Sequence, residues 1–286
     1  MEPILVILNP AARSEKARRA WEQIALLPGC KILPTTAVGD AQRLAEQAVK
    51  DGCKLIVAAG GDGTVNDVVN GIAGSEVTLG VLPVGTMNVF AAELGIPNDL
   101  QAAWKIIQKG ETRRVDLPQA NGKYFVQLAG VGLDAQVVEA TSWAFKKSFG
   151  PLSYLISAAQ IAARKPPKLI VKSEGHTVEG SFVLVGNGRY YGGPLAFFRD
   201  ARIDDGKLDV LIFKNLGYLD LARYLGTILM GRHTDLSDVE YFQTAELTVT
   251  SSEQVPIEVD GEVIGRLPVK FEMSPHALQV LVAAGP

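Results

Sequence analysis

The feature that most constrains this chain is a glycine-rich turn at residues 60–66, between an apolar run and a helical pattern. Residues 55–59 are all apolar, as expected of a strand buried on both faces of a parallel sheet. Val65, Val68 and Ile72 then recur at helical spacing. A strand that passes through glycines into a helix aims main-chain N–H groups at one spot, a geometry that suits a bound phosphate.

A carboxylate, Asp62, lies among these glycines, and its charge would repel a bound phosphate. The two are compatible when a divalent cation lies between them. The alternative is a plain tight turn in which Asp62 caps the next helix. No Gly-Lys-Ser/Thr sequence follows, and the glycine spacing is not that of the dinucleotide fingerprint, so neither of those phosphate-binding classes applies.

A second glycine turn of the same kind, at residues 84–88, follows the next apolar strand, residues 79–83. Val89, Phe90 and Leu94 then recur at helical spacing. Because successive parallel strands end along one edge of a sheet, we expect the two glycine turns to lie together, where such sheets bind ligands.

Composition excludes several other classes of protein. A net charge of −3 over 286 residues gives no global basic field for nucleic acid. Three histidines without metal-type spacing argue against a zinc site. The two cysteines form no motif, which favours a reducing, cytoplasmic setting. We expect no signal peptide and no membrane-spanning segment.

The pattern of elements changes near residue 111, from alternating strands and helices to mostly strands. We therefore predict two domains, residues 1–111 with a parallel α/β sheet and residues 112–286 with mostly antiparallel β structure, sandwich-like with a few helices. In the second domain we expect a hairpin of residues 113–117 and 124–128 around Asn121-Gly122. Later strands are predicted at residues 208–213, 241–250, 257–259, 269–273 and 278–282.

Two motifs together resemble the catalytic domain of the diacylglycerol kinase family, which includes bacterial lipid kinases and sphingosine kinases. They are Gly-Gly-Asp-Gly-Thr-Val-Asn at residues 60–66 and Leu-Pro-Val-Gly-Thr-Met-Asn at residues 82–88. The first alone is less specific, since NAD kinases and phosphofructokinases carry related loops. The resemblance implies an ATP-dependent lipid kinase with magnesium and an N-terminal fold like those two enzymes. A NAD kinase-like enzyme and a non-catalytic nucleotide sensor are the alternatives.

The resemblance also implies which residues contact ATP. Asn9, Pro10 and Thr35 have an equally good reading as ordinary turn residues, and Thr86 and Asn88 as helix caps. Where many relatives carry an aspartate after this asparagine, this chain has Val89, which leaves the handling of magnesium open. The implied ATP-binding set is Asn9, Pro10, Thr35, Gly60, Gly61, Asp62, Gly63, Thr64, Val65, Asn66, Gly85, Thr86 and Asn88.

Two acidic turns in the C-terminal half match further motifs of the family. The resemblance makes Asp260 or Glu262 the general base, with Asp62 as the third catalytic residue, while a solvated hairpin is the alternative. It also implies a magnesium ion held by Asp205 and by the main-chain carbonyls of Arg202 and Lys207. An Asp-Gly turn before a strand would explain that second segment equally well.

Aromatic residues and lysines alternate within residues 141–167, a composition typical of a membrane–water boundary as well as of an amphipathic helix on its own core. With the resemblance, this predicts a cytoplasmic protein in peripheral contact with the inner face of the membrane. The acceptor lipid stays open among diacylglycerol, a sphingoid base, phosphatidylglycerol and a polyprenol. The sequence is compatible with a homodimer and does not determine the oligomeric state.

Overall fold

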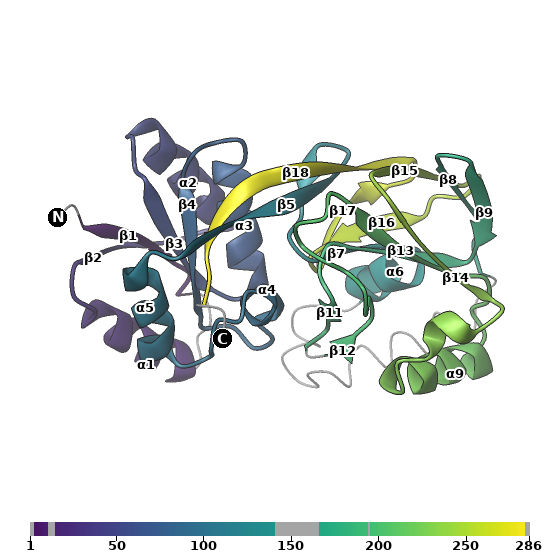
Figure 1. The fold of residues 1–286 in the computed structure, drawn as a ribbon, viewed down its shortest axis with the longest axis horizontal. Coiled ribbons are helices and arrows are strands. Elements are labelled where there is room, and N and C mark those ends of the chain that lie inside the picture. The colour runs from purple at the N-terminus through teal and green to yellow at the C-terminus, as the bar shows by residue number, and fades with distance from the viewer. Residues whose placement is uncertain (1–2, 11–14, 141–165, 194, 284–286) are drawn as a thin grey trace. The chain divides into compact units, whose positions relative to one another are not determined.

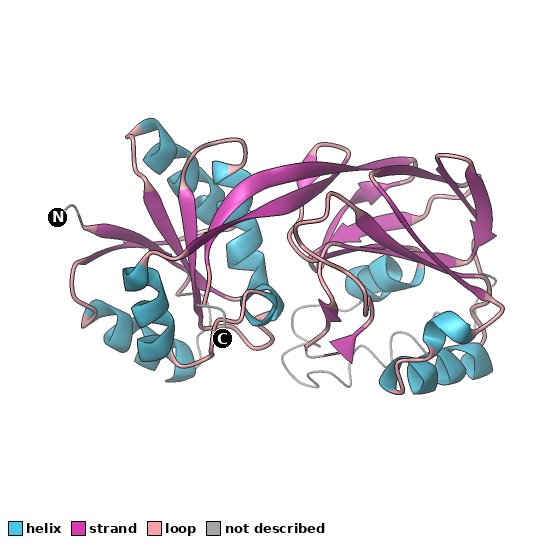
Figure 2. Cartoon of the chain, viewed as in Figure 1, coloured by secondary structure: helices cyan, strands magenta, loops and turns pink. Residues whose placement is uncertain are grey.

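The computed structural model describes residues 3–10, 15–140, 166–193 and 195–283, and Figures 1 and 2 show the fold. These residues form two compact units. The first contains the chain up to Leu117, Gly192 and Gly193, and the chain from Ser274 onward, and the second contains the rest. Where we predicted one boundary near residue 111, the last part of the chain therefore returns to the first unit.

A parallel sheet with helices on both faces makes up most of the first unit. Its elements are β1 (Ile4–Leu8), α1 (Glu15–Ala25), β2 (Cys30–Pro34), α2 (Asp40–Lys50), β3 (Leu55–Gly60), α3 (Asp62–Ile72), β4 (Thr78–Pro83), α4 (Val89–Glu93), α5 (Leu100–Lys109) and the end of β18 (Val269–Leu281). The strand order is β2-β1-β3-β4-β18, and all these pairs are parallel. Helices α2 and α3 lie on one face, and α1 and α5 on the other (Figure 1).

The central strands of this sheet are buried because helices cover them from both sides. Ile7 in β1 and Ile56 and Val57 in β3 have no exposed surface. Such continuous apolar strands are what a parallel sheet requires. The predicted α/β fold of the N-terminal half is confirmed.

The second unit is mostly antiparallel, as predicted. Its elements are β5 (Thr112–Ala120, shared with the first unit), β6 (Lys123–Tyr124), β7 (Leu128–Val131), α6 (Leu133–Ala140), β8 (Leu169–Ser173), β9 (His176–Gly180), β10 (Phe182–Gly186), β11 (Tyr190–Tyr191), β12 (Leu195–Ala196), β13 (Leu208–Phe213), α9 (Tyr218–Leu229), η1 (His233–Asp235), β14 (Val239–Thr244), β15 (Glu246–Thr250), β16 (Pro256–Val259), β17 (Glu262–Arg266) and the start of β18.

Two layers of strands enclose the core of this unit. One layer is a six-stranded sheet in the order β14-β13-β10-β7-β16-β17, and the other contains β18, β15, β8 and β9. Val183, Val249 and Phe271 pack between the layers. The other face of the six-stranded sheet packs on α6 and α9, through Leu133 and Tyr224 among others. With both faces covered, β13 is buried at every position.

Four predicted strands differ from the structure. Residues 241–250 are not one strand, because the chain breaks at Ala245 and its halves, β14 and β15, join different sheets. Residues 269–273 and 278–282 are not two strands, because the single strand β18 runs through 13 residues. Of residues 124–128, only Tyr124 stays in the predicted hairpin, and the rest turn toward β7 for a reason given below.

The membrane-facing segment that we predicted falls at residues 141–167, and residues 141–165 lie outside the described part of the chain. Its placement is therefore not described. Within the described ranges, no helix has the length and apolar character needed to span a bilayer.

Candidate active site

The turns that follow β1, β3 and β4 meet at one edge of the parallel sheet. The three strands are adjacent and parallel, so their carboxyl ends lie side by side. This brings the two glycine turns together, as the sequence predicted, and places Asn9 beside them. The Nδ2 of Asn9 donates a hydrogen bond to Oγ1 of Thr64 at 3.2 Å, which links the turn after β1 to the first glycine turn.

The two glycine turns touch each other through their main chains. A Cβ on Gly85 would stand 2.3 Å from the Cα of Gly61, far closer than any real contact, and 2.7 Å from Oδ1 of Asn88. The N–H of Val84 also donates to the carbonyl of Gly60 at 3.1 Å. Glycine is therefore required where the turns cross, since any side chain would push them apart.

Asp62 connects the two turns by a different contact. Its Oδ1 accepts the N–H of Phe90 at 3.2 Å, in the first turn of α4. Burial raises the pKa of the Asp62 carboxyl above its usual value, and main-chain N–H groups from Phe90 and Val89 oppose this effect. The Asp62 side chain therefore accepts an N–H group at the start of α4, the helix that follows the second glycine turn. The capping alternative had placed this contact at the start of α3, the helix that contains Asp62.

The remaining residues of the predicted ATP set divide by exposure. Pro10 and Thr86 are exposed, whereas Thr35, Asn66 and Asn88 are buried. Val65 and Asn66 are buried in α3, so their side chains pack beneath the first glycine turn and do not reach its surface. The side chain of Asn88 is committed to Gly85 and Asn98 rather than to capping α4. Gly60, Gly63 and Thr64 complete this edge of the sheet.

Alanine substitutions can separate the packing role of these glycines from a ligand role. Gly85→Ala is expected to lower the melting temperature, because overpacking of this kind costs about 1–3 kcal/mol. Gly63→Ala is the matched control, since a Cβ there meets nothing within 4 Å, and alanine favours a helix by about 0.5–1 kcal/mol. If phosphate binds at the turn, Gly63→Ala should weaken ATP binding about tenfold without loss of stability. Calorimetry of unfolding and of ATP binding measures both, and unchanged ATP affinity in Gly63→Ala would place the phosphate elsewhere.

In the second unit, β16 and β17 form a hairpin, here called the acidic hairpin, whose tip is Asp260-Gly261. Both tip residues have positive φ, 46° and 86°, as a two-residue turn of this kind requires. The Asp260 carboxylate accepts the N–H groups of Val126, Gln127 and Leu128 at 2.7, 3.0 and 3.1 Å. These three bonds draw the chain away from β6, which explains the strand that we predicted too long.

Glu262, two residues further on, lies in a different environment. Its side chain is 52% exposed, and one oxygen lies 3.1 Å from Nζ of Lys123. No other ion pair or hydrogen bond to this side chain is found within the described residues. Of the two carboxylates that the sequence left as candidates for a base, Asp260 has its lone pairs engaged and Glu262 has them accessible.

A third carboxylate of the acidic hairpin was missed as a site residue. Glu258 is 1% exposed, and its Oε2 accepts the N–H of Gly261 at 2.7 Å. Its neighbour is Asp134 of α6, whose Oδ1 accepts a hydrogen bond of 2.5 Å from the Tyr191 hydroxyl. Burial, and then the charge of Asp134, raise the pKa of Glu258 well above its usual value. A glutamate in an otherwise apolar strand was the available signal.

The loop before β13 contains the residues that the resemblance assigns to magnesium. Oδ1 of Asp205 accepts the N–H of Lys207 at 3.1 Å within this loop. Within the described ranges, no three His, Cys, Asp or Glu side chains are grouped to hold a metal. A cation here would need main-chain oxygens, such as the carbonyls of Arg202 and Lys207, beside the Asp205 carboxylate.

Negative charge around this loop fits such a cation. Asp209, the second residue of β13, is buried, and burial is the main cause that raises its pKa to about 6. The charges of Asp205 and Asp200 add to this effect. Carboxylate and carbonyl oxygens are the ligands that magnesium prefers, so the donor set of the loop suits this ion.

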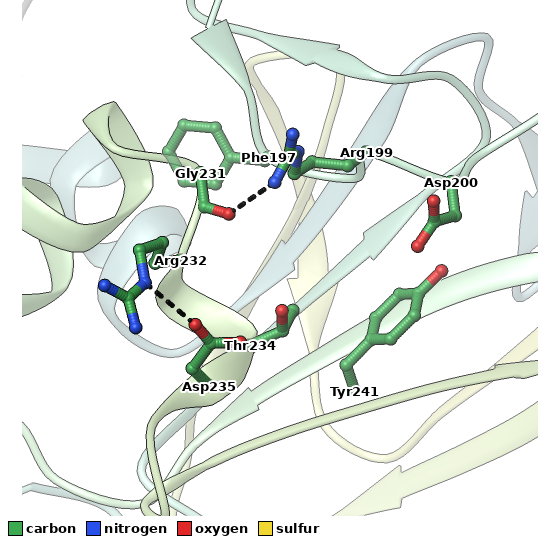
Figure 3. A pocket seen from close by; sticks show the side chains of 8 residues that line it. All are labelled: Phe197, Arg199, Asp200, Gly231, Arg232, Thr234, Asp235 and Tyr241. Carbon is green, nitrogen blue, oxygen red and sulfur yellow. Dashed lines mark hydrogen bonds and ion pairs between the residues drawn. The ribbon is translucent and has the colours of Figure 1, made fainter.

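Figure 3 shows a polar cavity of about 320 Å³ near the end of α9. Nη1 of Arg199 donates to the carbonyl of Gly231 at 2.7 Å, and Arg232 pairs with Asp235 at 3.0 Å. Both cations in its wall therefore already have partners. None of the sequence motifs predicted this cavity, and we assign no ligand to it.

Comparisons with known proteins agree across both units. Residues 3–120 match the model of the diacylglycerol kinase catalytic domain, and residues 127–282 match that of the YegS C-terminal NAD kinase beta sandwich-like domain. A diacylglycerol kinase of Staphylococcus aureus (strain MRSA252) is 34% identical over 276 residues, covering 93% of this chain and 88% of that protein. A crystal structure of a diacylglycerol kinase from Bacillus anthracis (strain Sterne) gives a TM-score of 0.81 at 26% identity, covering 99% of this chain and 97% of the other.

Proposed function

Since this chain belongs to the diacylglycerol kinase family, we propose that it transfers the γ-phosphate of ATP to a hydroxyl group of a membrane lipid. The observation that carries this proposal is the contact between the two glycine turns at the edge of the parallel sheet. Main-chain N–H groups at the start of α3 would face the phosphates there. The product would be a phospholipid or its precursor.

In this proposal each acidic residue has a separate task. Magnesium, when bound with ATP, supplies positive charge to the transferred phosphoryl group. Asp62 holds the two glycine turns in register through its contact with α4 and gives the negative charge that attracts the cation. Glu262 accepts the proton of the acceptor hydroxyl, because its oxygens are accessible. Asp260 fixes the acidic hairpin through its three main-chain contacts.

The decisive experiment offers labelled ATP and magnesium with a panel of dispersed lipids, and NAD as a competing acceptor. We expect label in one class of lipid, with release of ADP that depends on that lipid. Label in NAD instead would support the NAD kinase alternative. Binding of ATP without lipid-dependent ADP release would support a nucleotide sensor. A diacylglycerol, a sphingoid base, phosphatidylglycerol and a polyprenol in the panel identify the acceptor.

An apolar helix face supports contact with a membrane surface. Five large apolar side chains on and just after α9 are exposed. Exposed apolar residues on a protein surface are usually scattered singly, so such a group indicates an interaction site. Those residues are Tyr218, Leu219, Leu225, Leu229 and Met230. An interfacial helix buries such a face in the boundary between headgroups and acyl chains, and this placement is part of the proposal.

The double substitution Leu219→Glu/Leu229→Glu is therefore expected to weaken binding to lipid vesicles about tenfold or more, because two apolar groups leave the boundary. Co-sedimentation with vesicles measures this effect. Turnover of lipid dispersed in detergent should change little, since the substrate then reaches the enzyme without a bilayer. Equal loss in vesicles and in detergent would show that α9 does not act through membrane contact.

A further inference from the structure

Two carboxyl groups lie together beneath the acidic hairpin, the buried Glu258 and the half-buried Asp134, each with one oxygen that is out of reach of solvent. Oδ2 of Asp134 and Oε1 of Glu258 lie 2.5 Å and 2.8 Å from the point where a Cβ on Gly130 would stand. Neither oxygen has a hydrogen-bond donor among the described residues. Two carboxylate oxygens that face each other in a buried place repel strongly unless a proton lies between them.

We propose that Glu258 is a positioning residue, which keeps a proton that it shares with Asp134 and thereby fixes the acidic hairpin that carries Glu262. The link has two halves. Oε2 of Glu258 holds the tip through the N–H of Gly261 at 2.7 Å, and Oε1 reaches α6 through the shared proton. The Tyr191 hydroxyl donates to the far oxygen of Asp134 at 2.5 Å, which extends the link to β11.

The charged surroundings favour this protonation state. The side chains whose negative charge acts on Glu258 are Asp134 and Asp260, and the opposing contact is the N–H of Gly261. The Asp260 charge is already balanced by three main-chain N–H groups, so Asp260 cannot take up the proton without losing them. Glu258, which is 1% exposed, is thus the group whose ionisation costs most.

This state predicts how stability depends on pH. Above the usual glutamate pKa, an unfolded chain releases the proton of Glu258 while the folded chain keeps it. The folded state then binds more protons, so stability falls as pH rises, up to the raised pKa of Glu258. Below the usual glutamate value both states are protonated, and this contribution is fully present.

The first test is the melting temperature between pH 5 and pH 9 for the full chain and for Glu258→Gln. Glutamine keeps an N–H donor toward Asp134 and an oxygen for Gly261, and it does not titrate. Over the range where Glu258 stays protonated in the folded chain alone, we expect the parent to lose about 2–3 °C per pH unit relative to the variant. Parallel curves for the two proteins would overturn the shared proton. Glu139→Gln, an exposed residue of α6 paired with Arg266, is the matched control and should follow the parent.

The second test measures the hairpin itself by hydrogen exchange. In Glu258→Ala the Gly261 amide loses its acceptor, and we expect its exchange to rise about tenfold, whereas Glu258→Gln restores protection. Equal protection in the alanine and glutamine variants would overturn the positioning role. If Glu258→Ala does not fold, Asp134→Asn gives the answer, because its amide can donate to an ionised Glu258 and should remove the fall in stability with pH.

The catalytic consequence rests on the proposed function, because it assumes that Glu262 is the base. We expect Glu258→Ala to lower kcat about tenfold with little change in KM for ATP, and Glu258→Gln to recover most of that loss. Absence of lipid phosphorylation in the parent protein would refute the proposed function only. The melting and exchange experiments need no turnover, and they would still decide whether Glu258 holds the hairpin.

Discussion

Replacing Glu262 by glutamine is expected to lower kcat by about 10² to 10⁴-fold, the usual contribution of a general base. Glutamine has nearly the same size, but it cannot take a proton from an acceptor hydroxyl. The Glu262 side chain is 52% exposed, and its only ion pair or hydrogen bond among the described residues is with Lys123. The melting temperature and the affinity for ATP should therefore stay close to those of the parent. Steady-state kinetics with the acceptor lipid measures this change.

A matched control separates loss of the base from loss of a surface ion pair. Glu240 pairs with Lys214 at 3.1 Å, and its side chain is 41% exposed, so Glu240→Gln removes the same kind of contact away from the acidic hairpin. We expect unchanged kcat for this variant. Asp260→Asn should lower both kcat and the melting temperature, since an amide cannot accept all three main-chain N–H groups. Near-parental kcat in Glu262→Gln would remove Glu262 from the mechanism.

Replacing Asp62 by alanine is expected to abolish measurable turnover, a loss on the order of 10³-fold or more. Two effects combine in this variant, because the carboxylate contacts α4 and, in the proposed function, also supplies charge near the phosphates. Asp62→Asn isolates the charge, since an amide oxygen still accepts the N–H of Phe90. We therefore expect Asp62→Asn to fold normally and to bind ATP, but to show no measurable turnover at any magnesium concentration.

Helix capping alone is tested by Asp99→Ala. Oδ1 of Asp99 accepts the N–H of Ala102 at the start of α5, at 2.8 Å, and loss of such a cap costs about 1 kcal/mol. This variant should melt lower than the parent but keep its kcat. Full activity of Asp62→Asn would show that the charge of Asp62 is not needed. Asp62 would then only accept a main-chain N–H group at the start of a helix, as Asp99 does.

The sequence predicted the parts of the fold and of the candidate site that depend on local order. A glycine turn between an apolar strand and a helix is visible in a dozen residues, and the parallel sheet then places two such turns together. The resemblance added the acidic hairpin. The closeness of the two glycine turns follows from these local patterns, whereas the direct approach of Gly85 to Gly61 is seen only in the structure.

Contacts between distant residues were not foreseen. The N–H of Val126 donates to Asp260, 134 positions later. This bond ends the β5–β6 hairpin at Tyr124, whereas the alternation of residues in the sequence had predicted that its second strand continues to residue 128. Glu258 looks like an outward-facing strand residue until α6 brings Asp134 against it. The break at Ala245 is equally invisible, because both halves have strand character and only the sheets that they join differ. These features depend on tertiary partners that no short window of sequence contains.

The course of β18 has a consequence for how this protein is made. Gln279 and Val280 pair with Thr78 and Leu79 of β4, so one neighbour of β4 is a strand that is translated only after most of the second unit. While the ribosome is still at work, β4 has a bare edge with unsatisfied main-chain groups, and such edges invite intermolecular pairing. The first unit must therefore stay incompletely closed on the ribosome until the chain of the second unit has emerged.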